Sequence, residues 1–187
     1  MRCLIVLALV LAPLAATADP VRYLLQKDDS TVGFTWFLGK DAINGRMPVA
    51  DADLLIDLDE VRRTQVAVSL DLASAVAGFP FADQAMKGPR ILDAKRHPTI
   101  EFRSRSVTRV GDGARVDGDL TVRGVTRPVT LSAELYRQRG TAPDDLSRLS
   151  ILLKGSLSRS AFGADGWSDL AGDEVRLSIL ARMTRAE

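Results

Sequence analysis

The stretch Arg115–Leu135, RVDGDLTVRGVTRPVTLSAEL, decides how this sequence folds. Small or apolar residues alternate with polar ones in both of its halves. A period of two with one apolar face is what a half-buried antiparallel strand requires. Pro128 cannot donate a hydrogen bond to a neighbouring strand, so we expect it at the start of the second strand. The stretch predicts a β-hairpin whose buried residues are Val116, Gly118, Leu120, Val122, Val129, Leu131, Ala133 and Leu135.

The same alternation recurs along the chain and predicts an all-β protein. Turns are predicted at Asn44-Gly45 and at Gly111-Asp112-Gly113, because these residues tolerate positive φ, and an exposed loop is predicted over 137–147. At least seven amphipathic strands without a long helix must bury one face of a large antiparallel sheet. Closing the sheet into a barrel does this and removes exposed edges, which we favour over a two-sheet sandwich. The further strands are predicted over 31–38, 52–58, 66–72, 98–105, 149–157 and 175–183.

Residues 74–97 interrupt the alternation. Phe79-Pro80-Phe81 leads into a helix-forming run over 82–87, and Gly88 is placed to end it. A second short turn follows through Ile91 and Leu92. We expect one or two short helices in this long connection, and such excursions from a compact β domain are usually functional or lid-like.

The N-terminus has the anatomy of a secretory signal peptide. Arg2 precedes an apolar run over 4–14 that is too short to span a bilayer, and Ala16-Thr17-Ala18 offers a cleavage site. We expect a signal peptide over 1–18 and one domain over 19–187. Cleavage would remove Cys3, the only cysteine, so neither a disulfide nor a thiolate metal site is expected. The balance of 25 Lys and Arg against 24 Asp and Glu gives no reason to expect a nucleic-acid partner.

The sequence lacks the residue patterns that are typical of an enzyme active site. His97 is the only histidine, and no G-x-S-x-G nucleophile motif is present. Asp169 and Asp173 carry no pattern that assigns them a paired acid–base role. No catalytic residue, metal site or cofactor is therefore predicted. Four aspartates are spaced like the ligands of a cation-binding loop, but the residues between the second and third aspartates are those of a predicted strand. We therefore predict solvent-facing carboxylates at Asp51, Asp53, Asp57 and Asp59.

The sequence contains many large apolar side chains, and several of them lie on the excursion or on predicted loops. Taken singly, each is more readily explained as core. Together they could cap a barrel, and barrels of about eight strands can enclose one elongated apolar ligand. The candidate ligand-binding residues are Phe34, Trp36, Phe79, Phe81, Met86, Ile91, Leu92, Phe102, Leu120, Phe162 and Trp167.

An ordered set of motifs resembles the YceI-like family of bacterial periplasmic lipid-binding proteins. The hairpin segment LTVRGVTRPVTL is similar to the family's signature, and the other matching segments are Ser30–Phe34, Leu92–Ala94, His97–Ser104, Arg159–Gly163 and Gly172–Val175. The resemblance implies a lipocalin-like antiparallel barrel in the periplasm that holds a polyisoprenoid or prenyl quinone. Ile91 and Leu92 stand where the family often has paired phenylalanines, and Ala161 replaces a frequent Asp. The first change keeps the pocket apolar, and the second removes a polar contact.

Two other functions stay open at this stage. A protein-interaction module would have a filled barrel and dock a partner through Phe79 and Trp167. A lipid-modifying enzyme would need a buried carboxylate with a raised pKa among apolar side chains. The head group of the lipid, carriage against storage, transient contact with a membrane or membrane protein, and a homodimer are likewise left open.

Overall fold

The computed structural model describes residues 19–137, 142 and 145–187. Most of the predicted strands are present with small shifts of their bounds, while β1 and β3 had not been predicted. The elements are β1 (Val21–Leu25), β2 (Thr31–Leu38), β3 (Asp41–Met47), β4 (Val49–Ile56), β5 (Gln65–Asp71), α1 (Pro80–Lys87), β6 (Thr99–Val110), β7 (Gly113–Val122), β8 (Val125–Arg137), β9 (Arg148–Ser158) and β10 (Glu174–Arg185). Of the loop predicted over 137–147, residues 138–141, 143 and 144 lie outside the described residues.

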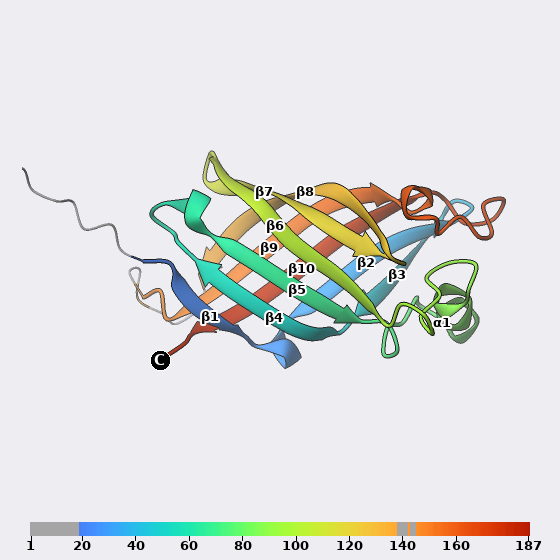
Figure 1. Cartoon of the computed structure of the whole chain (residues 1–187), viewed down its shortest axis with the longest axis horizontal. Helices are drawn as coiled ribbons and strands as arrows, with labels where there is room; N and C mark the ends of the chain where they lie inside the picture. The colour runs from blue at the N-terminus through green and yellow to red at the C-terminus, as the bar shows by residue number, and fades with distance from the viewer. Residues whose placement is uncertain (1–18, 138–141, 143–144) are drawn as a thin grey trace, which may run out of the picture.

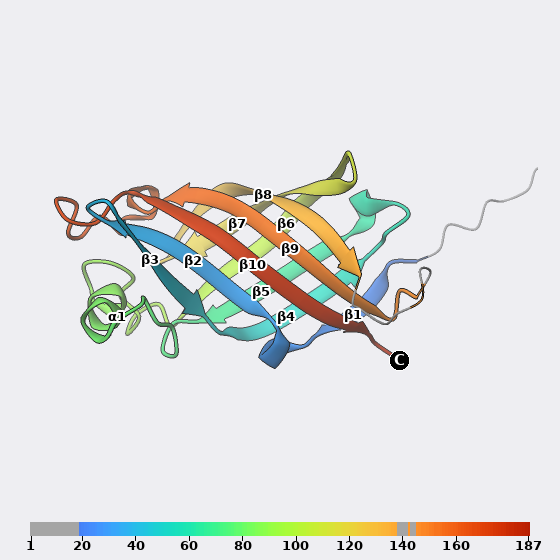
Figure 2. The ribbon, with the colours of Figure 1, turned by 180° about the vertical axis from the view of Figure 1, so that it is seen from behind.

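The sheet closes on itself as an antiparallel barrel (Figures 1 and 2). The order around the wall is β4-β5-β6-β7-β8-β9-β10, and β1 closes it by pairing with both β4 and β10. β2 follows β1 along the same edge of β10, and β3 leads into β4 with only Pro48 between them. The wall therefore has eight strand positions, which confirms the lipocalin-like barrel and not the sandwich.

The hairpin of β7 and β8 turns more tightly than predicted. Its two turn residues, Arg123 and Gly124, have φ of 55° and 75°. The strands pair from Val122↔Val125 onwards, so Pro128 lies inside β8 and not at its start. The prediction that Pro128 lies at the start of the second strand is wrong, because a two-residue turn with both φ positive already matches the strand twist and lets β8 begin at Val125.

The turn predicted at Asn44-Gly45 is also wrong. Both residues lie inside β3, and the chain turns instead at Gly39 and Lys40. Gly45 is paired with Phe34 across the strands, and a Cβ at position 45 would overlap the phenyl ring of Phe34. The glycine is required for the space that an inward aromatic ring occupies, not for positive φ.

The excursion of residues 72–98 covers one end of the barrel, on the right in Figure 1. It contains α1, which starts two residues earlier than predicted and buries Ala82 and Met86. Val76 exchanges two backbone hydrogen bonds with Arg46 of β3, at 2.8 and 3.0 Å. The C-terminus lies at the opposite end (Figure 1). We call residues 72–98 the lid.

Candidate functional site

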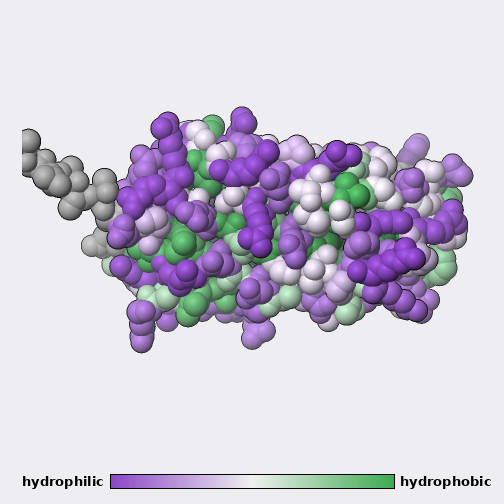
Figure 3. Space-filling view, in the orientation of Figure 1, coloured by the Kyte–Doolittle hydropathy of each residue, from purple (hydrophilic) through white to green (hydrophobic). Residues whose placement is uncertain are grey.

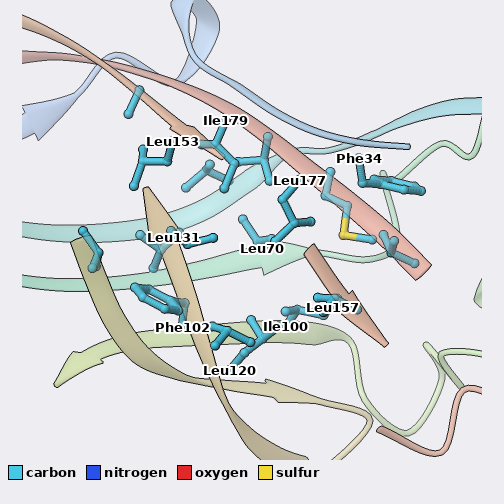
Figure 4. Close-up of a pocket in the computed structure, with 18 of the residues that line it drawn as sticks. Phe34, Leu70, Ile100, Phe102, Leu120, Leu131, Leu153, Leu157, Leu177 and Ile179 are labelled. Atoms are coloured by element: carbon cyan, nitrogen blue, oxygen red, sulfur yellow. The ribbon is translucent and has the colours of Figure 1, made fainter. Parts of the chain in front are cut away.

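The barrel encloses a cavity of about 730 Å³. This volume falls within the roughly 300–1,000 Å³ range of small-molecule sites. The cavity exists because every strand turns alternate side chains inward, and in Figure 4 side chains from different walls point into one space. The labelled residues there are Phe34, Leu70, Ile100, Phe102, Leu120, Leu131, Leu153, Leu157, Leu177 and Ile179.

The described lining is almost wholly apolar. Its charged or hydroxyl-bearing members are Ser30, Asp57, Thr64, Arg109, Asp112 and Arg159. In contrast, hydrophilic residues are spread over the outside of the wall, with apolar ones between them (Figure 3). An interior of this kind selects among ligands by their shape and apolar character, since it offers a ligand few polar partners.

All eleven residues predicted to bind a ligand line this cavity. Phe34, Leu120 and Phe162 are buried, while Phe81 is 68% exposed on α1. The structure thus brings the set together around one space. Contact with a ligand stays a prediction.

The cavity lining reaches the surface at the lid end. Leu38, Phe81, Trp167 and Leu170 line the cavity and are also exposed. Arg90 of the lid lies over the Trp167 ring, 5.0 Å from its centroid, and the Arg90 carbonyl accepts a 3.1 Å hydrogen bond from Gly166. The lid and the 159–173 loop therefore form a joint cover with an apolar mouth.

The sequence interpretation missed the middle of the cavity. Leu70, Leu153, Leu177 and Ile179 line it from β5, β9 and β10. Their alternation had predicted that they face inward, yet it gave no sign that the space between them would stay open. An inward residue of a packed core has the same pattern.

Arg159 organises the loop that follows β9. Its guanidinium donates to the carbonyls of Gly172, Gly166 and Ala171, each at 2.8 Å, and also to that of Ala164. A planar group with five N–H donors is suited to collecting several carbonyls. Although it lines the cavity, Arg159 has its donors committed to the loop, so its role is structural.

Asp173 fixes the other end of this loop. Its carboxylate accepts a 2.9 Å hydrogen bond from the backbone N–H of Ser160. The Ser158 hydroxyl and the Ser160 N–H lower the pKa of Asp173 below its ordinary value. Asp169 is exposed on the same loop. The two aspartates do not form an acid–base pair.

Asp57 is the buried carboxylate of the cavity lining. Its Oδ1 accepts from the backbone N–H groups of Asp59 and Glu60, at 3.1 and 2.8 Å. Its Oδ2 makes no hydrogen bond and lies 3.5 Å from Nε of Arg63. This is the geometry of a turn cap with an adjacent cation. The prediction that Asp57 faces solvent is wrong, because the turn folds over it.

His97 packs against the β7–β8 turn. A Cβ at Gly124 would lie 3.0 Å from Cε1 of His97. Among residues 19–137, 142 and 145–187, no group of three or more His, Cys, Asp or Glu side chains could hold a metal ion. In the same residues no helix is long and apolar enough to cross a membrane.

Comparison with known proteins agrees with this architecture. Residues 23–183 match the model of the YceI-like domain. The chain belongs to the YceI-like family. It is 31% identical to a UPF0312 protein of Pseudomonas putida over 156 residues, which are 81% of each chain. It is 29% identical to Protein YceI of Escherichia coli over 150 residues, which cover 79% of this chain and 74% of that one.

Two solved structures share the fold. The crystal structure of Burkholderia cenocepacia BcnA is similar with a TM-score of 0.75 at 20% identity, covering 84% of this chain and 98% of that one. A Campylobacter jejuni YCEI protein gives a TM-score of 0.63 at 19% identity, covering 81% and 89%. A YceI-like barrel of this kind is consistent with a binding protein.

Proposed function

We propose that this chain binds one elongated apolar lipid, a polyisoprenoid or prenyl quinone, inside its barrel. The observation that carries the proposal is the continuous apolar cavity of about 730 Å³. Burying apolar carbon is worth about 0.8 kcal/mol per CH₂ group. Two or three prenyl units would then offset the cost of ordering and approach roughly micromolar binding. We place the protein in the periplasm, as a non-catalytic carrier or store.

The apolar mouth supports a carrier role. Phe81 and Leu170 are 68% and 57% exposed where the cavity lining reaches the surface. A lipid that leaves or enters here would stay in contact with apolar side chains. Transient contact of this end with a membrane or a membrane protein is part of the proposal.

The two alternative functions, a protein-interaction module with a filled barrel and a lipid-modifying enzyme, find less support in the described residues. A filled barrel would have no open interior, whereas this one has a large cavity. An enzyme would need a free carboxylate in the pocket, whereas the Asp57 carboxylate caps a turn beside Arg63.

The direct test is mass spectrometry of an organic extract from the protein purified out of a bacterial periplasm. We expect one stoichiometric prenyl lipid. A lipid-free extract, unchanged after quinones and polyprenols are offered, would overturn the proposal and favour an interaction module.

A substitution in the cavity lining tests whether the lipid binds there. Ile91 lines the cavity from the lid and is half-buried, so Ile91→Asp puts a charge where a tail would lie. We expect at least a tenfold loss of lipid, since a carboxylate is costly to bury without a partner. Leu24→Asp is the control, because Leu24 is 58% exposed and does not line the cavity. Equal lipid in both folded variants would contradict this placement.

A further inference from the structure

The barrel wall has a seam between β8 and β9. The two strands pair from Arg137↔Leu149 to Ser132↔Lys154. Both then run on, to Val125 and to Ser158, without further pairing. In the register of the paired part, four opposed positions are thus left unpaired, from Leu131 and Gly155 to Pro128 and Ser158.

Gly155 lies at the point where the strands part. A Cβ there would lie 2.9 Å from the carbonyl oxygen of Thr130 and 2.6 Å from Cδ2 of Leu131. Contacts this short are not tolerated by a real side chain. The glycine lets β8 pass close to β9 at this point before the two strands separate.

Pro128 keeps the seam from closing by backbone pairing. Val122↔Val125 closes a two-residue turn and is therefore a hydrogen-bonded pair. Pairs alternate along the ladder, so Asp119↔Pro128 is not hydrogen-bonded and the Pro128 nitrogen faces β9. Proline has no N–H to donate there. Pro128 thus lies on β8 where the edge toward β9 is unpaired, and proline is tolerated at such a position.

An open groove follows the seam on the outside of the barrel. Its floor is apolar and is shared with the cavity, since the same four side chains line both spaces. Phe162, only 2% exposed, is the largest of them. The residues that border both the groove and the cavity are Val129, Leu157, Phe162 and Leu177.

The rim of the groove carries two cations without a carboxylate partner. Arg127 is paired with inward-facing Leu120, yet its side chain is exposed and its Nε donates to the Ala161 carbonyl across the seam at 3.2 Å. Lys154 stands on β9 at the opposite side. Within the described residues, no carboxylate lies within 4.0 Å of either charge.

The remaining charges of the groove neutralise each other. Arg176 donates two hydrogen bonds to Glu174, at 3.2 and 3.1 Å, and its guanidinium lies 4.8 Å from the centre of the Phe37 ring. Hydroxyls complete the described rim, at Thr130, Ser156, Ser158 and Ser178. The Thr130 hydroxyl donates to Asp117 and the Ser158 hydroxyl bonds Asp173, which leaves Ser156 and Ser178. The lining of the groove therefore carries a net positive charge above an apolar floor.

We propose that this seam groove holds the phosphate-type head group of an amphiphile whose prenyl tail lies in the cavity. The inference rests on the proposed function and narrows it to an anionic prenyl lipid. Arg127 and Lys154 supply charge-assisted hydrogen bonds to the head group from the two sides of the seam. The tail passes between β8 and β9 where Phe162 separates the two spaces.

Binding measurements with three probes test the head-group site. The probes are a prenyl phosphate, the matching prenyl alcohol and inorganic phosphate, each titrated into lipid-free protein. We expect wild type to prefer the prenyl phosphate over the alcohol by at least tenfold. Arg127→Gln and Lys154→Gln should each lower that preference by roughly tenfold while leaving the affinity for the alcohol unchanged. Arg103→Gln is the control, since Arg103 is exposed on β6, away from the seam.

The outcomes separate this inference from the proposed function. Equal affinity for phosphate and alcohol in wild type overturns the head-group site but leaves lipid binding intact. Inorganic phosphate binding as tightly as the prenyl phosphate also overturns it, because the tail would then contribute nothing. If neither prenyl compound binds, the proposed function itself fails.

Cross-linking tests the seam without removing its charges. Thr130→Cys on β8 and Ser156→Cys on β9, which both line the groove, joined by a short bis-maleimide in a Cys3→Ser background, would tie the seam shut. We expect the affinity for the prenyl phosphate to fall by at least tenfold, because its tail can no longer cross the seam, while the alcohol still binds. The same reagent between cysteines at Glu134 and Leu152, a directly opposed pair in the closed part of the same strands, is the control. Equal affinity for the prenyl phosphate in both linked proteins would contradict a tail that crosses the seam.

Discussion

Nε1 of Trp36 donates a 3.0 Å hydrogen bond to the backbone carbonyl of Ala77. This bond joins an inward residue of β2 to the lid, and Phe79 packs near the same indole with its ring centroid 6.3 Å away. Ala77 is 2% exposed, so its carbonyl has little access to water. One side chain therefore both lines the cavity and holds the lid.

Trp36→Phe separates these two roles. The variant keeps an aromatic ring against Phe79 but leaves the Ala77 carbonyl without its donor, which we expect to cost about 1–3 kcal/mol. Hydrogen exchange should show faster opening of the lid backbone near Ala77, while the β6–β9 wall is unchanged. Tyr136→Phe is the control, because its ring is 48% exposed on β8 and does not line the cavity. Uniformly faster exchange over the whole barrel would show that the bond supports global stability and not the lid.

Arg159 should be hard to replace even by lysine. A lysine ammonium offers three donors from a point charge and cannot reproduce a planar fork that reaches four carbonyls. We expect Arg159→Lys and Arg159→Ala both to lower the free energy of unfolding by about 2–3 kcal/mol, or Tm by roughly 5–10 °C.

Limited proteolysis of these Arg159 variants should place the damage in the 160–172 loop. Arg115→Ala is the control, since that guanidinium pairs with Asp117 on the outside of the barrel. A lysine variant as stable as wild type would mean that charge alone suffices at this position.

The hairpin and the barrel follow from the sequence because alternation reports directly which face of a strand is buried. Turn dipeptides are less decisive, as Asn44-Gly45 shows: glycine serves there to make room for the Phe34 ring. β1 is short, at five residues, and carries too few alternations to be distinguished from a loop. The sequence of Arg115–Leu135 likewise could not show that residues 125–131 of its second strand lack a partner on the β9 side.

The candidate site was predicted in outline only. Aromatic and large apolar residues on the excursion pointed to the cover, and all of those named line the cavity. The openness of the interior depends on the volumes of many side chains meeting from opposite walls, which no local pattern contains. Asp57 shows the same limit, since its burial depends on how the turn before β5 folds back over it.

Asp173 should make stability depend on pH in the acid range. Its pKa is lowered in the folded state, chiefly by the Ser158 hydroxyl and then by the Ser160 N–H. A lowered pKa means that the stabilisation is present above the ordinary value near 4 and is lost as pH falls through the folded pKa. Asp173→Asn should therefore be less stable than wild type at pH 7, with the difference shrinking below about pH 4. Urea unfolding from pH 7 to pH 3 measures this, with exposed Asp169→Asn as the control, and a pH-independent difference would refute the linkage.

Two adjacent residues of β9, one facing the cavity and one facing outward, provide a cavity-filling variant and its matched control. Leu153 lines the cavity, whereas Leu152 does not. Leu153→Trp should extend the indole into the open space, because inward and outward positions alternate along a strand. We expect at least a tenfold loss of prenyl-lipid binding with the free energy of unfolding changed by less than about 1.5 kcal/mol, since the added volume fills a void. Leu152→Trp adds the same side chain to the outer face and should bind like wild type. If both variants retain the lipid equally, the tail does not pass the middle of the barrel, and the ligand must lie nearer the lid.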